Sequence, residues 1–224
     1  SLRHLILGDG VIGQGVADEL ARLGQPLALA SRSGPKVPPA RHDHLRLDAL
    51  DGPALRAAVR GVTHLYLTLG LPYATRVWQR DWPRVMRNAI DAAAAEGALL
   101  VFLDNVYAYG PLPLQVPMRE DHPVQPPARK GAVRAQLPPL LATAQRERGL
   151  RWVIGRSADF YGPGVRQSPL FAAAIERQLQ GKAAQWLGDP DALHSFTCVP
   201  DAARGLVRLA LDESAWQRAW HLPT

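Results

Sequence analysis

Three closely spaced glycines near the start of the chain limit its fold more than any other feature. Gly8, Gly10 and Gly13 follow an apolar run at 5–7 and open an amphipathic stretch at 11–23. In a strand–turn–helix unit, such glycines permit a sharp turn, close approach of backbone amides to a pyrophosphate, and packing of helix on strand. The helix N-terminus then favours the phosphate charge. We therefore expect a dinucleotide to contact Gly8, Gly10, Val11, Ile12 and Gly13.

The residues after the second expected strand, at 27–30, indicate which dinucleotide is preferred. An acidic residue there would bind the ribose 2′-hydroxyl of NAD, but the chain has Ser31, Arg32 and Ser33. A guanidinium beside two hydroxyls suits a 2′-phosphate, so the sequence predicts NADP, with NAD as the alternative. The competing interpretation is that Arg32 is an ordinary solvated arginine.

Composition and charge argue against several other partners. The 26 basic and 20 acidic residues give a net charge of +6, but the basic residues form no cluster, so we expect no nucleic-acid binding. No apolar run is long enough to span a bilayer and no signal peptide precedes the first strand, so we expect no membrane association and a cytoplasmic location. The single cysteine, Cys198, is interpreted as a buried, inert thiol. His42 and His44 lack a third ligand nearby, so no metal site is predicted.

Alternating strand and helix patterns predict an α/β fold with a parallel sheet and helices on both faces. The expected strands of the first part cover 5–7, 27–30, 44–47, 64–69, 99–103 and 152–155, and its helices cover 11–23, 53–59, 82–95 and 132–148. Asp51 is expected to cap the second of these helices.

The pattern changes after residue 163. It predicts a helix from Ser168 and Pro169 to about residue 180, strands at 185–187, 196–199 and 220–222, and a helix at 201–211. We therefore expect a dinucleotide-binding domain at 1–163 and a small substrate lobe at 164–224 that is interleaved with it.

Four motifs follow the glycine turn at characteristic distances. Asp48 follows the third strand, the segment 105–110 follows the fifth, and the segments 156–164 and 194–202 come later. Together with the glycine turn, they resemble the NAD-dependent epimerase/dehydratase family of extended and atypical short-chain dehydrogenases/reductases. The resemblance implies a Rossmann-like, doubly wound parallel sheet, with Asp48 contacting adenine. It also implies an incomplete C-terminal substrate lobe, because family members continue beyond the point matching Thr224.

The chain departs from the catalytic pattern of that family. Its members move a proton with a Tyr-x-x-x-Lys pair after the fifth strand, but no tyrosine here has Lys or Arg four residues later. The matching segment contains Lys130 and Arg134. Lys130 is expected to contact the cofactor, and Arg134 to hold its ribose or steady an anion.

Asn105 and Tyr107 are the remaining candidates for catalysis on this side. Asn105 matches the Ser or Thr that hydrogen-bonds substrate in the family, and its amide can do the same. Tyr107 matches an acidic residue of the dehydratases, so it is the candidate proton donor, with packing as the alternative. Tyr109 matches a structural tyrosine, for which packing is favoured.

Two further departures concern the substrate. Asp159 and His194 replace the asparagine and arginine that nucleotide-sugar enzymes set against a diphosphate. Because a carboxylate would repel phosphate, we expect a smaller carbonyl or hydroxyl compound rather than a nucleotide sugar. Alternatively, Asp159 caps a turn or pairs with Arg156 or Arg166.

The favoured hypothesis is an oxidoreductase or epimerase-like enzyme that binds NADP or NAD. The missing tyrosine–lysine pair also fits a non-catalytic NADP(H) sensor of the same superfamily, and a scaffold without cofactor is the third hypothesis. A homodimer through the helices after the fourth and fifth strands is expected by analogy alone.

Overall fold

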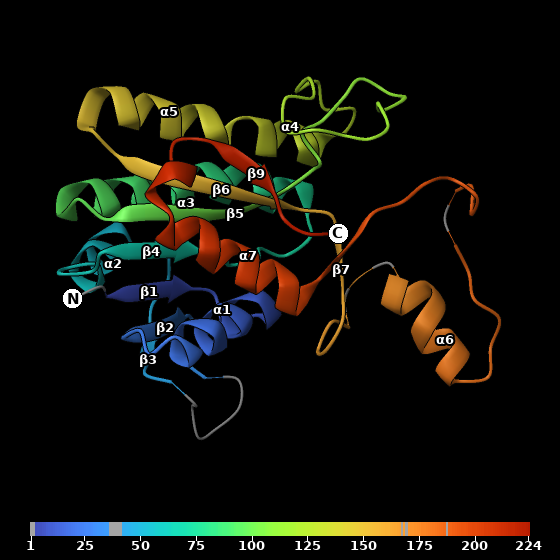
Figure 1. Cartoon of the computed structure of the whole chain (residues 1–224), viewed down its shortest axis with the longest axis horizontal. Helices are drawn as coiled ribbons and strands as arrows, with labels where there is room; N and C mark the ends of the chain where they lie inside the picture. The colour runs from blue at the N-terminus through green and yellow to red at the C-terminus, as the bar shows by residue number, and fades with distance from the viewer. Residues whose placement is uncertain (1–2, 36–41, 167, 169, 187) are drawn as a thin grey trace.

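The structure is a computed structural model that describes residues 3–35, 42–166, 168, 170–186 and 188–224. Its main sheet contains β1 (His4–Leu7), β2 (Leu27–Ser31), β3 (His44–Arg46), β4 (His64–Leu67), β5 (Leu99–Asn105), β6 (Arg151–Ser157) and β9 (Ala219–His221). These strands are all parallel and lie in the order β3-β2-β1-β4-β5-β6-β9 (Figure 1). The chain changes direction across the sheet between β3 and β4, so the carboxyl ends of β1 and β4 flank the point where such folds bind ligands.

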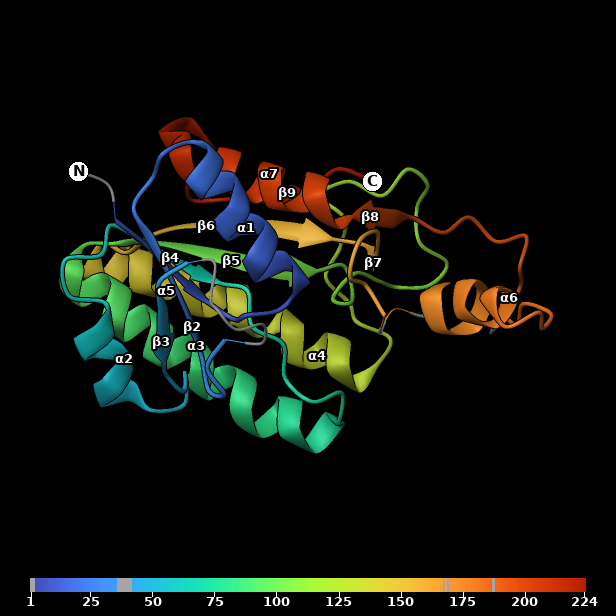
Figure 2. The ribbon, with the colours of Figure 1, turned by 90° about the horizontal axis from the view of Figure 1, so that it is seen from below.

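Helices cover both faces of this sheet (Figure 2). On one face lie α1 (Val11–Arg22) and α7 (Val199–Leu211), and on the other lie α2 (Gly52–Ala58), α3 (Thr75–Glu96), α4 (Arg129–Ala135) and α5 (Leu137–Arg148). The predicted doubly wound α/β fold is confirmed.

The core has two apolar layers, one on each face of the sheet. Alternate side chains of a strand point to opposite faces. Accordingly, Leu5 and Leu7 of β1 pack in the layer that also contains Trp82 of α3, whereas Ile6 packs with Leu206 of α7. Because both faces are covered, even the four residues of β1 are all buried, as is typical of parallel sheets.

Prolines explain two differences between the expected and observed helices. The expected helix at 132–148 is two helices, because Pro138 and Pro139 at the start of α5 have no N–H to continue the ladder from α4. The helix expected to begin at Trp82 begins at Thr75 and continues through Pro83. Asp51 caps α2 as predicted, since its carboxylate accepts a hydrogen bond of 3.0 Å from the Ala54 amide.

The segment after β6 forms a small extension beside the carboxyl edge of the sheet. It contains β7 (Asp159–Tyr161), which pairs with β8 (Phe196–Cys198), and a π-helical turn η1 (Phe171–Ile175) that continues into α6 (Glu176–Leu179). These helices project away from the main sheet (Figure 1). The Ser168 hydroxyl accepts the Phe171 amide at their start, 3.1 Å away.

The rest of the expected lobe returns to the main body. Helix α7 packs on α1 (Figure 2), and β9 is the last strand of the main sheet. A single 3₁₀ turn, η2 (Glu213–Ala215), joins α7 to β9. The division of the chain into two domains therefore stays a prediction. The strand expected at 185–187 is wrong for residues 185–186, which are irregular, whereas Pro169 and Leu187 lie outside the described residues. Cys198 is half-buried rather than buried.

Candidate functional site

The glycine turn between β1 and α1 has the geometry that the sequence predicts. Gly8 has φ +118°, and a Cβ there would lie 2.6 Å from the Leu69 backbone nitrogen. A Cβ at Gly13 would lie 1.8 Å from the Gly8 carbonyl oxygen, so neither position accepts a side chain. A Cβ at Gly10 would meet nothing within 4 Å. The space next to Gly10 is therefore open, as close approach of a pyrophosphate requires.

The N-terminus of α1 faces the same open space. Gly10 is its N-cap and supplies no capping side chain, so the first-turn amides have no side-chain acceptor at this cap. Val11 beside it is exposed at 36%, whereas Ile12 is buried in the core. A Cβ at Gly164 would lie 3.1 Å from Val11 Cγ1, so the structure brings the 156–164 motif against the turn.

The Ser31–Ser33 turn lies at the carboxyl end of β2, next to β1. The Ser31 hydroxyl donates to the Gly34 carbonyl at 3.1 Å, while Arg32 and Ser33 are exposed. Arg46 of β3 donates from Nε to the Arg32 carbonyl at 3.1 Å. Two arginines therefore converge on this turn, and sequence reasoning considered only Arg32.

Two aspartates near this edge have different surroundings. Asp48 accepts a hydrogen bond of 2.9 Å from the Leu50 amide and is half-buried just after β3. Asp9 lies inside the glycine turn, where its buried carboxylate accepts a hydrogen bond from the Gln14 amide group and lies 3.6 Å from His44 Nε2. The Asp9 charge is thus held within the protein.

A buried ion network lies beneath the carboxyl ends of β5 and β6. Asp104 and Arg156 are register partners on these strands, with Arg156 Nε 3.5 Å from Asp104 Oδ2. Arg134 of α4 contacts the same carboxylate, with its Nη1 3.4 Å from Asp104 Oδ1. Burial raises the pKa of Asp104, whereas the two guanidinium groups oppose that shift. All three side chains are at most 8% exposed.

The network fixes Arg134 in place. Its guanidinium carbon lies 3.9 Å from the centre of the Trp82 ring and 5.0 Å from that of Trp78. Burial lowers the pKa of Arg134, and the Asp104 carboxylate opposes this effect. Arg134 is therefore a buried partner of Asp104, which leaves little freedom for it to hold a cofactor ribose.

Tyr107 lies over this network in an aromatic cluster. Its ring stacks on Trp78 at 6.4 Å and 14°, and the Lys130 ammonium lies 3.1 Å from the centre of the Tyr73 ring. Burial raises the pKa of Tyr107, and the Asp159 carboxylate and Tyr73 raise it further. The phenol therefore stays protonated at neutral pH.

The other residues of the predicted site meet at the same edge. Asn105 ends β5, and its Oδ1 accepts a hydrogen bond of 3.0 Å from the Tyr107 amide. Among the described residues no acceptor bonds Nδ2, so its protons are available to a ligand. Asp159 pairs with His194, whose Nε2 lies 2.9 Å from Asp159 Oδ2. The alternative pairing of Asp159 with Arg156 is not seen, because Arg156 pairs with Asp104.

Sequence reasoning missed three contributors, Tyr73, Trp78 and Asp104, and it considered Arg156 only within the 156–164 motif and as a partner of Asp159. Tyr73 and Trp78 follow β4, whose carboxyl end is part of the binding edge, so their position was a usable signal. Nothing in the sequence reveals that Asp104 and Arg156 are register partners. Tyr109 packs below the site, 2% exposed, and accepts a hydrogen bond of 2.7 Å from Arg156.

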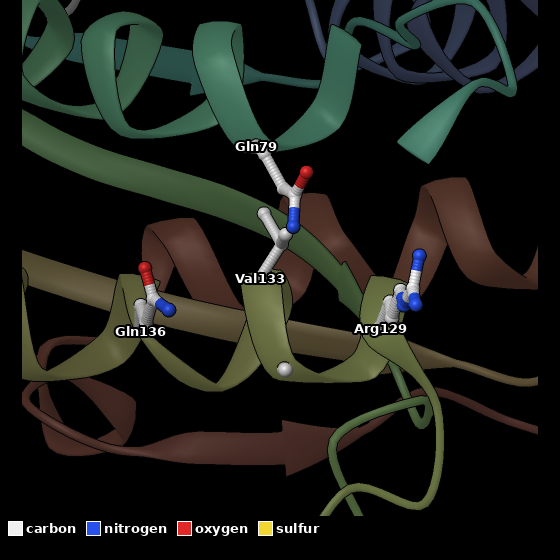
Figure 3. Close-up of a pocket in the computed structure, with 5 residues that line it drawn as sticks. Gln79, Arg129, Val133 and Gln136 are labelled. Carbon is white, nitrogen blue, oxygen red and sulfur yellow. The ribbon is translucent and has the colours of Figure 1, made fainter. Parts of the chain in front are cut away.

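A separate hollow of about 240 Å³ lies between α3 and α4 (Figure 3). Gln79, Arg129, Val133 and Gln136 line it, together with Ala132. The residues predicted to bind cofactor or substrate are not among its lining residues, so this hollow is not the predicted site.

No helix in the described part of the chain is long and apolar enough to cross a membrane. Within the same residues, no three His, Cys, Asp or Glu side chains gather as a metal site would need.

Comparisons with known proteins agree with this architecture. The chain is similar in fold to UDP-glucose 4-epimerase of Thermus thermophilus, determined in complex with NAD, at 22% identity and a TM-score of 0.79; the match covers 100% of this chain and 78% of that one. It is also similar to UDP-N-acetylglucosamine 4-epimerase from Bacillus cereus, at 18% identity and a TM-score of 0.85, over 99% and 75% of the two chains.

A third similar structure is DesIV, a dTDP-glucose 4,6-dehydratase from Streptomyces venezuelae with NAD and TYD bound, at 18% identity and a TM-score of 0.82, over 99% and 75% of the chains. A search of curated proteins found no match. The family model for the NAD dependent epimerase/dehydratase family matches residues 4–219. The chain therefore belongs to the NAD-dependent epimerase/dehydratase family.

Proposed function

We propose that this protein is an oxidoreductase or epimerase-like enzyme that binds NADP(H) and acts on a small carbonyl or hydroxyl compound. The glycine turn carries this proposal, because Gly8 and Gly13 exclude side chains while the space at Gly10 is open beside an uncapped helix N-terminus. A dinucleotide would be held by this turn and would supply or accept a hydride when bound.

The preference for NADP over NAD is supported by the charges at the end of β2. Exposed Arg32 and neighbouring Arg46 both place positive charge at this turn, which favours a 2′-phosphate, and Ser31 and Ser33 add hydroxyls. No carboxylate follows β2 to bind a 2′-hydroxyl. The three similar structures do not decide this point, because their identities of 18–22% show the fold alone.

Three side chains could position the substrate's oxygen at the carboxyl edge. The Asn105 amide has free protons to donate, and the Tyr107 phenol is protonated at neutral pH. The Lys130 ammonium lies against the Tyr73 ring, one helical turn before Arg134. We propose that Asn105 binds the oxygen and that Tyr107 donates a hydrogen bond to it.

The proposed substrate is not a nucleotide sugar. The pair of Asp159 and His194 occupies the place of the asparagine and arginine that face a diphosphate in nucleotide-sugar enzymes. The carboxylate is 19% exposed, so it still repels a phosphate brought near it. Isothermal titration with UDP-glucose tests this point, since tight binding that is lost in Asp159→Arg would contradict it.

A sensor function without turnover is the second candidate, and the burial of Arg134 favours it. The family lysine keeps its ammonium next to the cofactor, whereas Arg134 is held by Asp104 and Trp82. A sensor would bind NADP and NADPH with different affinities and convert no substrate. The homodimer expected by analogy would use α3, which follows β4, and α4 and α5, which follow β5. Light scattering measures whether the protein is a dimer.

Fluorescence titration with NADPH and then NADH tests the proposed cofactor. We expect NADPH to bind at least about tenfold more tightly, and Arg32→Ala to remove most of that preference. Arg60→Ala is the matched control, because Arg60 is also exposed but lies in the turn after α2. If neither nucleotide binds, both the enzyme and the sensor function are wrong. Equal affinities for NADPH and NADH would overturn only the preference for NADP, not the binding of a dinucleotide.

A further inference from the structure

Asp159 and His194 come from segments 35 residues apart, and the small sheet brings them together. Asp159 begins β7 and is the register partner of Phe196, which begins β8. His194 lies two residues before Phe196, so its ring reaches Asp159, and the distance from Nε2 to Oδ2 is 2.9 Å. The pair is thus built by strand register rather than by chance contact of two loops.

Aromatic rings fix the orientation of His194. Its ring centre lies 4.6 Å from that of Phe196 at 31°, and 5.6 Å from that of Trp186 at 89°. Its side chain is still 42% exposed. In the described part of the chain, Nδ1 has no hydrogen-bond partner, so one ring nitrogen is held and the other is available.

The pair also belongs to the proposed substrate site. Ser157, at the carboxyl end of β6, is the register partner of Asn105, and Asp159 begins β7 two residues after Ser157. The Asp159 carboxylate also helps to raise the pKa of Tyr107. In this protein no tyrosine occupies the family's proton-transfer position, where Lys130 stands instead. A group that can both give and take a proton near neutral pH is therefore missing from the residues around Asn105 and Tyr107.

We propose that Asp159 and His194 form a proton-transfer dyad that replaces the family's tyrosine–lysine pair. Asp159 accepts a hydrogen bond from the Nε2–H group and so fixes the tautomer, which leaves the Nδ1 lone pair for acid–base work. In the reducing direction, the N–H bond at Nδ1 of the imidazolium breaks and its proton forms an O–H bond with the substrate's oxygen. The electron pair stays on Nδ1, and oxidation runs the same transfer backwards. Asp159 is a positioning residue in this dyad.

This inference rests on the proposed function for its substrate, but the dyad can be tested without one. Nitrogen-15 spectra of histidine-labelled protein, recorded where imidazoles are neutral, report which ring nitrogen carries the proton. We expect His194 to carry it on Nε2, and Asp159→Asn to abolish that preference, because an amide can donate as well as accept. A proton on Nδ1 in the unaltered chain would overturn the dyad.

Kinetics provide the second readout, with NADPH and para-nitrobenzaldehyde as the probe pair. We expect His194→Gln to lower kcat by about 100-fold with little change in NADPH affinity, because glutamine can hold Asp159 but cannot transfer a proton. Asp159→Asn should lower kcat less, by about tenfold, with KM nearly unchanged.

His42 offers a matched control. It forms the same kind of pair with Asp18 of α1, with Nε2 3.0 Å from Oδ1, but takes no part in the proposed site. His42→Gln should leave kcat unchanged. If His194→Gln also keeps full turnover, the dyad is wrong while the cofactor assignment stands. If no nucleotide binds, the proposed function fails, and the tautomer measurement alone supports or overturns the dyad.

Discussion

Acid is expected to destabilise this protein through a buried histidine far from the proposed site. His4 of β1 is 2% exposed, its ring stacks on His64 at 4.6 Å, and its Nδ1 lies 3.2 Å from the Tyr66 hydroxyl. Burial lowers the pKa of His4 from 6.5 to about 4, and the neighbouring His64 adds to the shift. The folded protein therefore resists taking up a proton at His4.

The size of the effect follows from this shift. Well above pH 6.5 the His4 ring is neutral in both the folded and the unfolded chain, so its titration does not lower the free energy of unfolding. As the pH falls from 6.5 toward 4, the unfolded chain takes up a proton that the folded protein does not, and stability is lost through that window. A shift of this size corresponds to about 3 kcal/mol, and partial solvent screening at the amino-terminal end of β1 reduces it to about 2 kcal/mol.

Urea unfolding followed by tryptophan fluorescence measures this loss. The His4→Phe variant keeps an aromatic ring against His64 but cannot take up a proton. Between about pH 7.5 and pH 4.5, we expect the free energy of unfolding to fall by about 2 kcal/mol more in the unaltered protein than in His4→Phe. His42→Gln should follow the unaltered protein. Equal pH dependence of His4→Phe and the unaltered protein would refute the reasoning.

Three other substitutions have defined expected outcomes. Gly10→Ala should weaken NADPH binding at least about tenfold in fluorescence titration without changing urea unfolding, because its Cβ enters open space that a pyrophosphate needs. Arg134→Met should lower the free energy of unfolding in urea by about 3 kcal/mol, because buried Asp104 loses one of its two partners. Asp51→Ala should cost about 1 kcal/mol in the same assay, because the cap of α2 is lost. Unchanged NADPH affinity, or unfolding energies equal to those of the unaltered protein, would contradict these expectations.

The sheet could be predicted because its signals are local. The apolar run before Gly8, and the strand–helix alternation that follows, depend only on neighbouring residues. The start of α3 could not be predicted in this way. A proline normally ends a helix, but α3 passes through Pro83, since burial of Trp78, Trp82 and Val85 on one side outweighs the lost hydrogen bond.

The site was harder to predict because it depends on pairings between distant segments. The sequence places Asp159 and His194 at family positions, yet only the register of β7 with β8 shows that they form a pair. Likewise, Arg134 stands one helical turn after Lys130, as the family lysine stands after its tyrosine. Its burial against Trp82 depends on how α4 packs on α3, which no local pattern reveals.

The two halves of the proposed function therefore depend on different parts of the sheet. Cofactor binding depends on the ends of β1 and β2, where the glycine turn and Arg32 lie. The proposed proton transfer depends on the carboxyl end of β5 and the start of β7, and Arg134 of α4 is already engaged there by Asp104 of β5. A substitution among the residues proposed for proton transfer can abolish turnover while nucleotide binding persists, which is the behaviour of a sensor. The proposed turnover thus requires an acid–base group other than Arg134, and His194 has a carboxylate partner and, among the described residues, a ring nitrogen without one.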